Sequence, residues 1–158
     1  MIVVADASPL IALSRVSRLE LLRQMFGTLI VPEAVWNEVT AVAPGRAGVA
    51  EILHSSWIQH VPVKDAGLVR LLRQNLGAGE SEAIVLAREI QADVLLIDER
   101  LGRSAATRLG LTITGLVGVL IEARRSGLLP DAAEVVNALR SEAGFWISDE
   151  LTNLIIDS

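Results

Sequence analysis

The chain has 158 residues, of which 51% are hydrophobic, and its formal net charge is −5 at pH 7. This hydrophobic content excludes an intrinsically disordered chain, and the length suits one domain with a sizeable core, so we expect a single domain over residues 1–158. The negative charge argues against a protein that merely coats nucleic acid, because that mode of binding needs many cationic contacts to phosphates.

Three further absences narrow the class of protein. The longest uncharged run, Leu109 to Ile121, is too short to cross a membrane. No basic segment precedes the apolar N-terminus, which argues against a secretory signal. The chain has no cysteine, which excludes disulfides and thiolate metal sites. We therefore expect a cytoplasmic protein without a membrane segment.

The first eight residues predict a strand followed by a helix. Residues 2–5 form an apolar run typical of a short buried strand, and Asp6 follows it directly. Ser8 and Pro9 suit the N-cap and the first position of a helix over residues 10–16. Asp6 is therefore expected at the carboxyl end of a parallel strand, where α/β proteins bind their ligands.

The rest of the chain alternates helices with strands. Helices are expected at 19–26, 32–42, 49–53, 66–76, 80–90, 100–109, 116–125, 132–143 and 149–156, the last with Ser148 as its N-cap. Strands are expected at 28–31, 57–61, 94–97 and 111–114, and breaks at 43–45 and 77–79. This alternation predicts an α/β fold with a mostly parallel sheet covered by helices on both faces.

Two buried strands end in an aspartate, because Asp98 follows the strand at 94–97 as Asp6 follows the first. Two such aspartates at one edge of a sheet need a cation between them. Either aspartate could instead be present only to cap the helix that follows its strand. That explanation suits Asp98, which could cap the helix starting at Arg100, better than Asp6, because Ser8 is the better cap there.

Glu38 lies in an apolar part of the helix expected at 32–42. At 100° per residue, Val31, Val39 and Val42 lie within about 40° of Val35, and Glu38 lies about 60° away on the same side. An acid in an apolar arc is costly unless it is paired or binds a metal. The alternative is a glutamate at the edge of the face that reaches solvent.

The helix expected at 80–90 carries two more candidate acids. Glu80 lies about 20° from Ala87 on the packed face, whereas Glu82 points about 140° away. Either acid could also serve only to complement the dipole of the first helical turn. In the helix at 66–76, Leu68, Leu71, Leu72 and Leu76 share one side, which predicts a core-facing surface.

Together these acids form an oxygen-only set of ligands, which consists of Asp6, Glu38, Glu80 and Asp98. Oxygen ligands without histidine or cysteine select hard cations such as Mg²⁺ or Mn²⁺. The two histidines, His54 and His60, fall in the irregular middle of the chain and are expected at the surface.

The motifs around these acids resemble the PIN-domain family of metal-dependent ribonucleases, and the resemblance covers nearly the whole chain. The matching segments are V-V-A-D-A-S-P-L-I, V-P-E-A-V-W-N-E-V, L-G-A-G-E-S-E-A-I-V-L-A and L-L-I-D-E-R-L-G-R-S-A-A. The tail resembles a prokaryotic branch of that family that is often paired with small antitoxin proteins. It reads T-G-L-V-G-V-L-I-E-A-R-R-S-G-L-L-P and, later, R-S-E-A-G-F-W-I-S-D-E-L.

The resemblance implies a three-layer α/β/α sandwich with a five-stranded parallel sheet and acids that bind Mg²⁺ or Mn²⁺. Asp6, Glu38 and Asp98 match acidic positions of the family. The remaining acid, usually Asp, is Glu here, and it is Glu80 or Glu82. Ser8 matches a hydroxyl beside the first aspartate and Arg103 a basic residue after the last acid, so both are expected to contact substrate.

The expected function is hydrolysis of RNA phosphodiester bonds by the toxin of a toxin–antitoxin pair, with RNA, a small antitoxin and a second copy of the chain as partners. Arg15 and Arg100 are further candidates for phosphate contacts or are simply solvated. A clustered set of leucines fits either a dimer interface or the core: Leu10, Leu13, Leu19, Leu21, Leu22 and the segment 151–156.

Two other functions fit the same acids. One is an aspartyl-phosphate phosphoacceptor or phosphatase that uses Asp6, although the only lysine, Lys64, does not follow the fifth strand. The other is a catalytically weak or inactive binding module for nucleic acid or protein, whose acidic pocket receives an arginine from a partner. Metal binding by the free protein separates this module from a nuclease.

Overall fold

Five parallel strands form one sheet in the computed structural model, which describes residues 1–41 and 49–158. The strand order is β3-β2-β1-β4-β5. The strands are β1 (Val3–Ala5), β2 (Leu29–Pro32), β3 (Ile58–Val61), β4 (Val94–Leu96) and β5 (Ile113–Thr114). The predicted α/β sandwich around a parallel, five-stranded sheet is confirmed.

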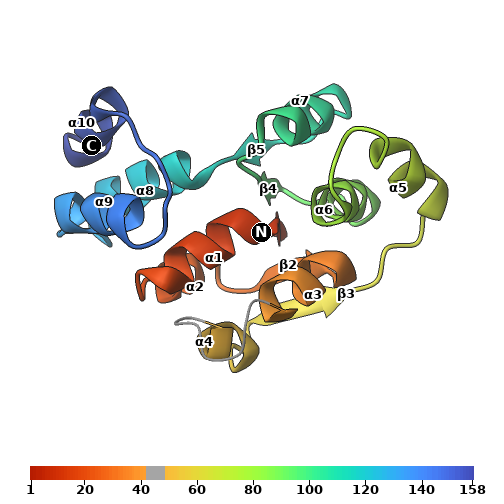
Figure 1. Ribbon diagram of the computed structural model, residues 1–158, viewed down its shortest axis with the longest axis horizontal. Coiled ribbons are helices and arrows are strands. Elements are labelled where there is room, and N and C mark those ends of the chain that lie inside the picture. Colours follow the sequence, from red (N-terminus) through yellow and green to blue (C-terminus); the bar gives the residue numbers. More distant parts are fainter. Residues whose placement is uncertain (42–48) are drawn as a thin grey trace.

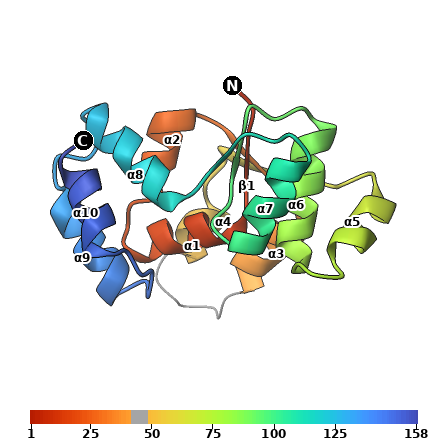
Figure 2. The ribbon, with the colours of Figure 1, turned by 90° about the horizontal axis from the view of Figure 1, so that it is seen from above.

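Helices cover both faces of this sheet (Figures 1 and 2). On one side lie α5 (Ala66–Leu72), α6 (Ala78–Glu89) and α7 (Arg100–Arg108). On the other side lie α1 (Ala7–Arg15), α2 (Glu20–Phe26), α8 (Leu116–Arg125), α9 (Ala132–Ser141) and α10 (Asp149–Ile156). The remaining helices, α3 (Glu33–Ala41) and α4 (Val49–Leu53), connect β2 to β3.

The central strand β1 marks the point where the chain changes direction across the sheet. Val4 pairs with Ile30 of β2 on one side and with Leu95 of β4 on the other. The chain builds β2 and β3 outward from β1 and then returns to place β4 on its other side. In open parallel sheets, the crevice at such a switch point, beyond the carboxyl ends of the strands, is the usual ligand site.

The first helix begins earlier than predicted. Ser8 is not its N-cap, because α1 starts at Ala7 and Asp6 holds the capping position. Pro9 still lies in the first turn, where backbone N–H groups have no partner within the helix, so a proline there costs no hydrogen bond. The argument that Ser8 frees Asp6 from a capping position was therefore wrong, although the Asp6 side chain makes no capping hydrogen bond.

The segment from 66 to 79 also differs from the prediction. Helix α5 ends at Leu72 and has no fully buried residue. Leu72 and Leu76 are half-buried and pack against the core, as predicted, whereas Leu71 is 58% exposed and does not. The expected break at 77–79 is instead the start of α6, with Gly77 as its N-cap. Glycine lowers the helix propensity of this turn, but packing against α3 outweighs that cost.

The helix expected at 32–42 is observed as α3, and Pro32 ends β2 instead of starting the helix. Val42 and the break at 43–45 lie outside the described residues. His54 and His60 are exposed, as predicted. Among the described residues, no helix has the length and apolar character needed to cross a membrane.

Most of the leucines that were considered for a dimer interface belong to the core. The buried ones are Leu10, Leu13, Leu19, Leu21 and Leu22. Leu151 and Leu154 on α10 are instead 39% and 54% exposed. The N-terminal leucines therefore support the fold, and only the C-terminal pair remains on the surface.

Candidate active site

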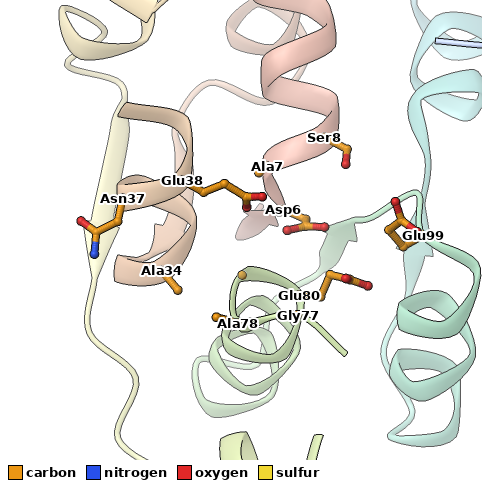
Figure 3. A pocket seen from close by; sticks show the side chains of 11 residues that line it. Asp6, Ala7, Ser8, Ala34, Asn37, Glu38, Gly77, Ala78, Glu80 and Glu99 are labelled. Carbon is orange, nitrogen blue, oxygen red and sulfur yellow. The ribbon is translucent and has the colours of Figure 1, made fainter. Parts of the chain in front are cut away.

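A cavity of about 450 Å³ opens beyond the carboxyl end of β1. Four carboxylates from four segments line it: Asp6 after β1, Glu38 on α3, Glu80 on α6 and Glu99 after β4 (Figure 3). Asp6 lies in the centre, between Glu38 and Glu99. Ser8 on α1 and Asn37 on α3 also line the cavity.

Asp6 is the most buried of these acids, with an exposed fraction of 3%. Its backbone N–H donates to the Leu96 carbonyl at 2.9 Å, which holds the end of β1 against β4. The pKa of Asp6 is raised to about 7, chiefly by burial and also by the charges of Glu80, Glu38 and Asp98, against the lowering effect of the Ala7 amide. The charged form of Asp6 is therefore costly near neutral pH unless a cation lies beside it.

Glu38 and Glu80 meet Asp6 because α3 packs closely on α6. A Cβ atom at Gly79 would lie 2.9 Å from Glu38 Oε2 and 3.5 Å from Asp6 Oδ1, so a larger residue would displace the end of the Glu38 side chain from its position beside Asp6. Burial raises the pKa of Glu38 and of Glu80, and the charges of Glu99 and Glu38 add to the rise for Glu80. The helical phase that singled out Glu38 and Glu80 thus agrees with their positions.

Asp98 lies beside the cavity and is hydrogen-bonded to α8, which covers the other face of the sheet from α6 and α7. Its Oδ1 accepts a hydrogen bond from the Leu116 N–H at 2.9 Å, at the start of α8. Its Oδ2 is buried and has no hydrogen-bond partner. Burial raises the pKa of Asp98, while Leu116 N–H and Arg103 lower it. Asp98 therefore caps α8, not the helix that follows it at Arg100.

Glu82 lies outside the cavity. Its Oε1 accepts a hydrogen bond from the Ala34 N–H at 3.2 Å, so it supports the N-terminus of α3. It lines a separate hollow together with Arg70 and Arg73. Of the two glutamates at the start of α6, the structure thus brings only Glu80 to Asp6.

The three predicted arginines occupy different environments. Arg103 donates to the Ile97 carbonyl at 3.1 Å and lies near Asp98. The Arg103 side chain therefore stabilises the loop between β4 and α7. Arg15 donates to the Ala143 carbonyl at 3.4 Å, which ties α1 to the end of α9. Arg100 is exposed at the start of α7.

Glu99 is the cavity residue that the sequence analysis missed. It holds the N-cap position of α7 but makes no side-chain capping hydrogen bond. The available signal was the pair of adjacent acids after β4, of which only Asp98 was considered. Because the backbone turns between β4 and α7, the second acid reaches the cavity wall.

The acids fit a hard divalent cation in type, although their present spacing is wide. Within residues 1–41 and 49–158, no three Asp, Glu, His or Cys side chains stand close enough together to hold an ion as they are. The buried Oδ2 of Asp98 has no hydrogen-bond partner, and the raised pKa of Asp6 shows that its negative charge lacks a counterion. Glu38 and Glu80 end in flexible side chains that can close on Asp6, so these oxygen ligands suit Mg²⁺ or Mn²⁺.

Gly115 keeps room for Asp98, and we expect Gly115→Ala to destabilise the protein. A Cβ atom there would lie 2.6 Å from Asp98 Oδ1 and 2.7 Å from the Arg103 guanidinium. Overpacking of this kind costs about 1–3 kcal/mol. Urea denaturation measures it, with Gly67→Ala on exposed α5 as the control, because its nearest neighbour is 3.6 Å away. Equal stability of the two variants would contradict the expectation.

Comparison with known families gives one match. A family model described as a PIN domain matches residues 2–158. No curated protein matches the chain, and neither does any solved structure.

Proposed function

Because the chain belongs to the PIN-domain family, which has a nuclease-type fold, we propose that it is a metal-dependent endoribonuclease. The observation that carries the proposal is the four-acid cavity beyond the carboxyl end of β1. Oxygen ligands around a buried aspartate whose pKa is raised suit a site that exchanges a proton for a divalent cation.

Asp6, Glu38 and Glu80 would hold the cation, and the free oxygen of Asp98 would complete the set. When bound, a divalent cation lowers the pKa of water and neutralises charge on a phosphate. Asp6 fixes the position of the site, because its backbone joins β1 to β4. Ser8 lines the same cavity, and its hydroxyl would donate to a substrate oxygen there.

The aspartyl-phosphate alternative has less support. Asp6 faces three other acids, which would repel the phosphate that must approach it. The only lysine, Lys64, lies in the loop before α5 and does not line the cavity. A binding module remains the other alternative, because a partner's arginine would also relieve the charge on these acids.

The biological setting belongs to the same proposal. The tail that resembles the antitoxin-paired branch supports a toxin role, in the cytoplasm, with RNA as substrate and a small antitoxin as inhibitor. Arg103 was expected to contact substrate, but its bond to Ile97 O supports a positioning role beside Asp98. A homodimer is supported by the exposed leucines of α10, Leu151 and Leu154.

Cleavage of single-stranded RNA by the purified protein tests the proposal. We expect cleavage with Mn²⁺ or Mg²⁺ and none with EDTA. Glu80→Gln should lower the affinity for Mn²⁺ at least tenfold, because it removes a cavity ligand. Glu82→Gln is the matched control. It should keep the affinity and instead lower the free energy of unfolding by about 1 kcal/mol through the weakened support of α3.

Two results would contradict these expectations. If Glu82→Gln lost the metal and Glu80→Gln kept it, the assignment of the helix-borne acid would be reversed. If the wild-type protein bound Mn²⁺ but cleaved no RNA, the endoribonuclease proposal would fail and the binding module would replace it.

A further inference from the structure

A second hollow, of about 290 Å³, lies between residues 71–76 and α7. We refer to it as the α5–α7 groove. Its apolar lining consists of Leu71, Leu72, Leu76, Leu101 and Ala105, and its polar lining of Gln74, Asn75, Ser104 and Arg108. No acid lines this groove, whereas four acids line the candidate active site.

The α5–α7 groove adjoins the four-acid cavity through two short segments. Leu76 lines the groove, and the next residue, Gly77, lines the cavity. On the other wall, Glu99 lines the cavity and Leu101 lines the groove. With a rise of about 1.5 Å per helical residue, the groove side of α7 runs roughly 3–13 Å away from Glu99. A strand cleaved in the cavity would therefore pass the groove.

The wall of the groove includes exposed leucine side chains. Leu71 and Leu101 are 58% and 63% exposed, while Leu72, Leu76 and Ala105 pack against the core. Apolar side chains of this kind can hold the flat face of an unstacked base. The carboxamides of Gln74 and Asn75 can both donate and accept hydrogen bonds, as base edges require.

Helix α7, which forms one wall of the groove, also carries positive charge (Figure 1 shows the position of α7). Arg100 and Arg108 of α7 make no ion pair within the described part of the chain. Arg73 is not part of this group, because it lines the separate hollow that also holds Glu33 and Glu82. On the opposite side of the sheet, Arg18, Arg125 and Arg140 are each paired with an acid, and Arg15 and Arg124 donate to backbone carbonyls. Free arginines beside an apolar groove favour a phosphodiester chain, because each phosphate brings a negative charge.

We propose that the α5–α7 groove binds a nucleobase of the RNA strand adjacent to the scissile phosphate, with Arg108 at a neighbouring phosphate. This inference rests on the proposed nuclease function and adds a substrate subsite to it. It also accounts for the exposed leucines on a chain that has few aromatic side chains for stacking.

Kinetics on a short single-stranded RNA with Mn²⁺ test the subsite, using Leu71→Ser, Leu101→Ser and Arg108→Gln. We expect each variant to raise KM about tenfold, as loss of one base or phosphate contact would, and to leave kcat unchanged. Leu53→Ser on α4, with a similar exposed fraction of 49% and outside both hollows, is the matched control and should keep the wild-type KM. Thermal melts establish that each variant is folded.

A series of RNAs with one abasic position each locates the base. One position should raise KM for the wild-type protein but cause no further rise in Leu101→Ser. Unchanged KM in both leucine variants would overturn the subsite and point to a protein-docking surface. If the wild-type protein cleaves no RNA, the proposed function fails by itself. In that case the affinity of the variants for the same RNA tests the subsite. Weaker binding than that of the wild-type protein supports the subsite, and equal binding overturns it.

Discussion

Replacing Asp6 with Asn is expected to abolish metal-dependent RNA cleavage and to stabilise the cation-free protein at the same time. Asp6 lies at the centre of the four-acid cavity, so losing its charge should lower the rate roughly 10²–10³-fold, as loss of a preorganised charge does elsewhere. The same charge is costly without a cation, because Asp6 is buried beside other acids. Asn removes that cost.

The two effects are measured separately, by RNA cleavage with Mn²⁺ and by urea denaturation in EDTA at pH 8. Asp157→Asn is the control, since Asp157 is exposed at the end of α10 and should change neither quantity. Full cleavage activity in Asp6→Asn would rule out the proposed site. A loss of stability in EDTA would show that Asp6 is structural and not held for a cation.

The stability of the cation-free protein is expected to fall as the pH rises from about 4 to about 7. Below pH 4, Asp6 is protonated in both the folded and the unfolded chain, so it contributes no difference. Between its ordinary pKa of 3.8 and its folded value of about 7, the unfolded chain releases the proton and the folded chain keeps it. Rising pH therefore favours unfolding, by about 4 kcal/mol once Asp6 is ionised in both states.

A divalent cation should reverse this trend, because it takes the place of the proton. We expect Mg²⁺ to raise the melting temperature little at pH 5 and clearly at pH 8. The raised pKa values of Glu38, Glu80 and Asp98 act in the same direction. Thermal melts at both pH values, with and without Mg²⁺, measure the effect. An unchanged pH dependence in Asp6→Asn would contradict the role of Asp6.

The parts of the site that depend on local periodicity could be predicted from the sequence. The apolar run at 2–5 placed Asp6 at a strand end, and parallel pairing with β4 then fixed its surroundings. The phase of α3 set Glu38 apart from its neighbours, and the phase of α6 favoured Glu80 over Glu82. In each case the periodicity of a single element was enough.

The remaining features depend on contacts between distant segments. Glu82 supports α3 across 48 positions of sequence, and Asp98 caps α8 across 18, and neither partner can be identified from spacing. Leu71 was expected in the core because helical phase cannot show that an open groove toward α7 leaves this leucine exposed while Leu72 packs. Glu99 was missed because the turn after β4, not any repeat, directs its side chain.

The bond between Asp98 and the Leu116 N–H links the cavity to the last third of the chain. The Leu116 N–H lies in the first turn of α8, and α8 packs on α10. The C-terminal helices therefore hold Asp98 in its orientation. A change that moves α8, such as truncation of the C-terminal residues or binding of a partner to α10, would reorient Asp98 without a direct contact to the cavity. Asp6, Glu38 and Glu80 would then lose the free oxygen of Asp98 as a further ligand, through a disturbance near the C-terminus.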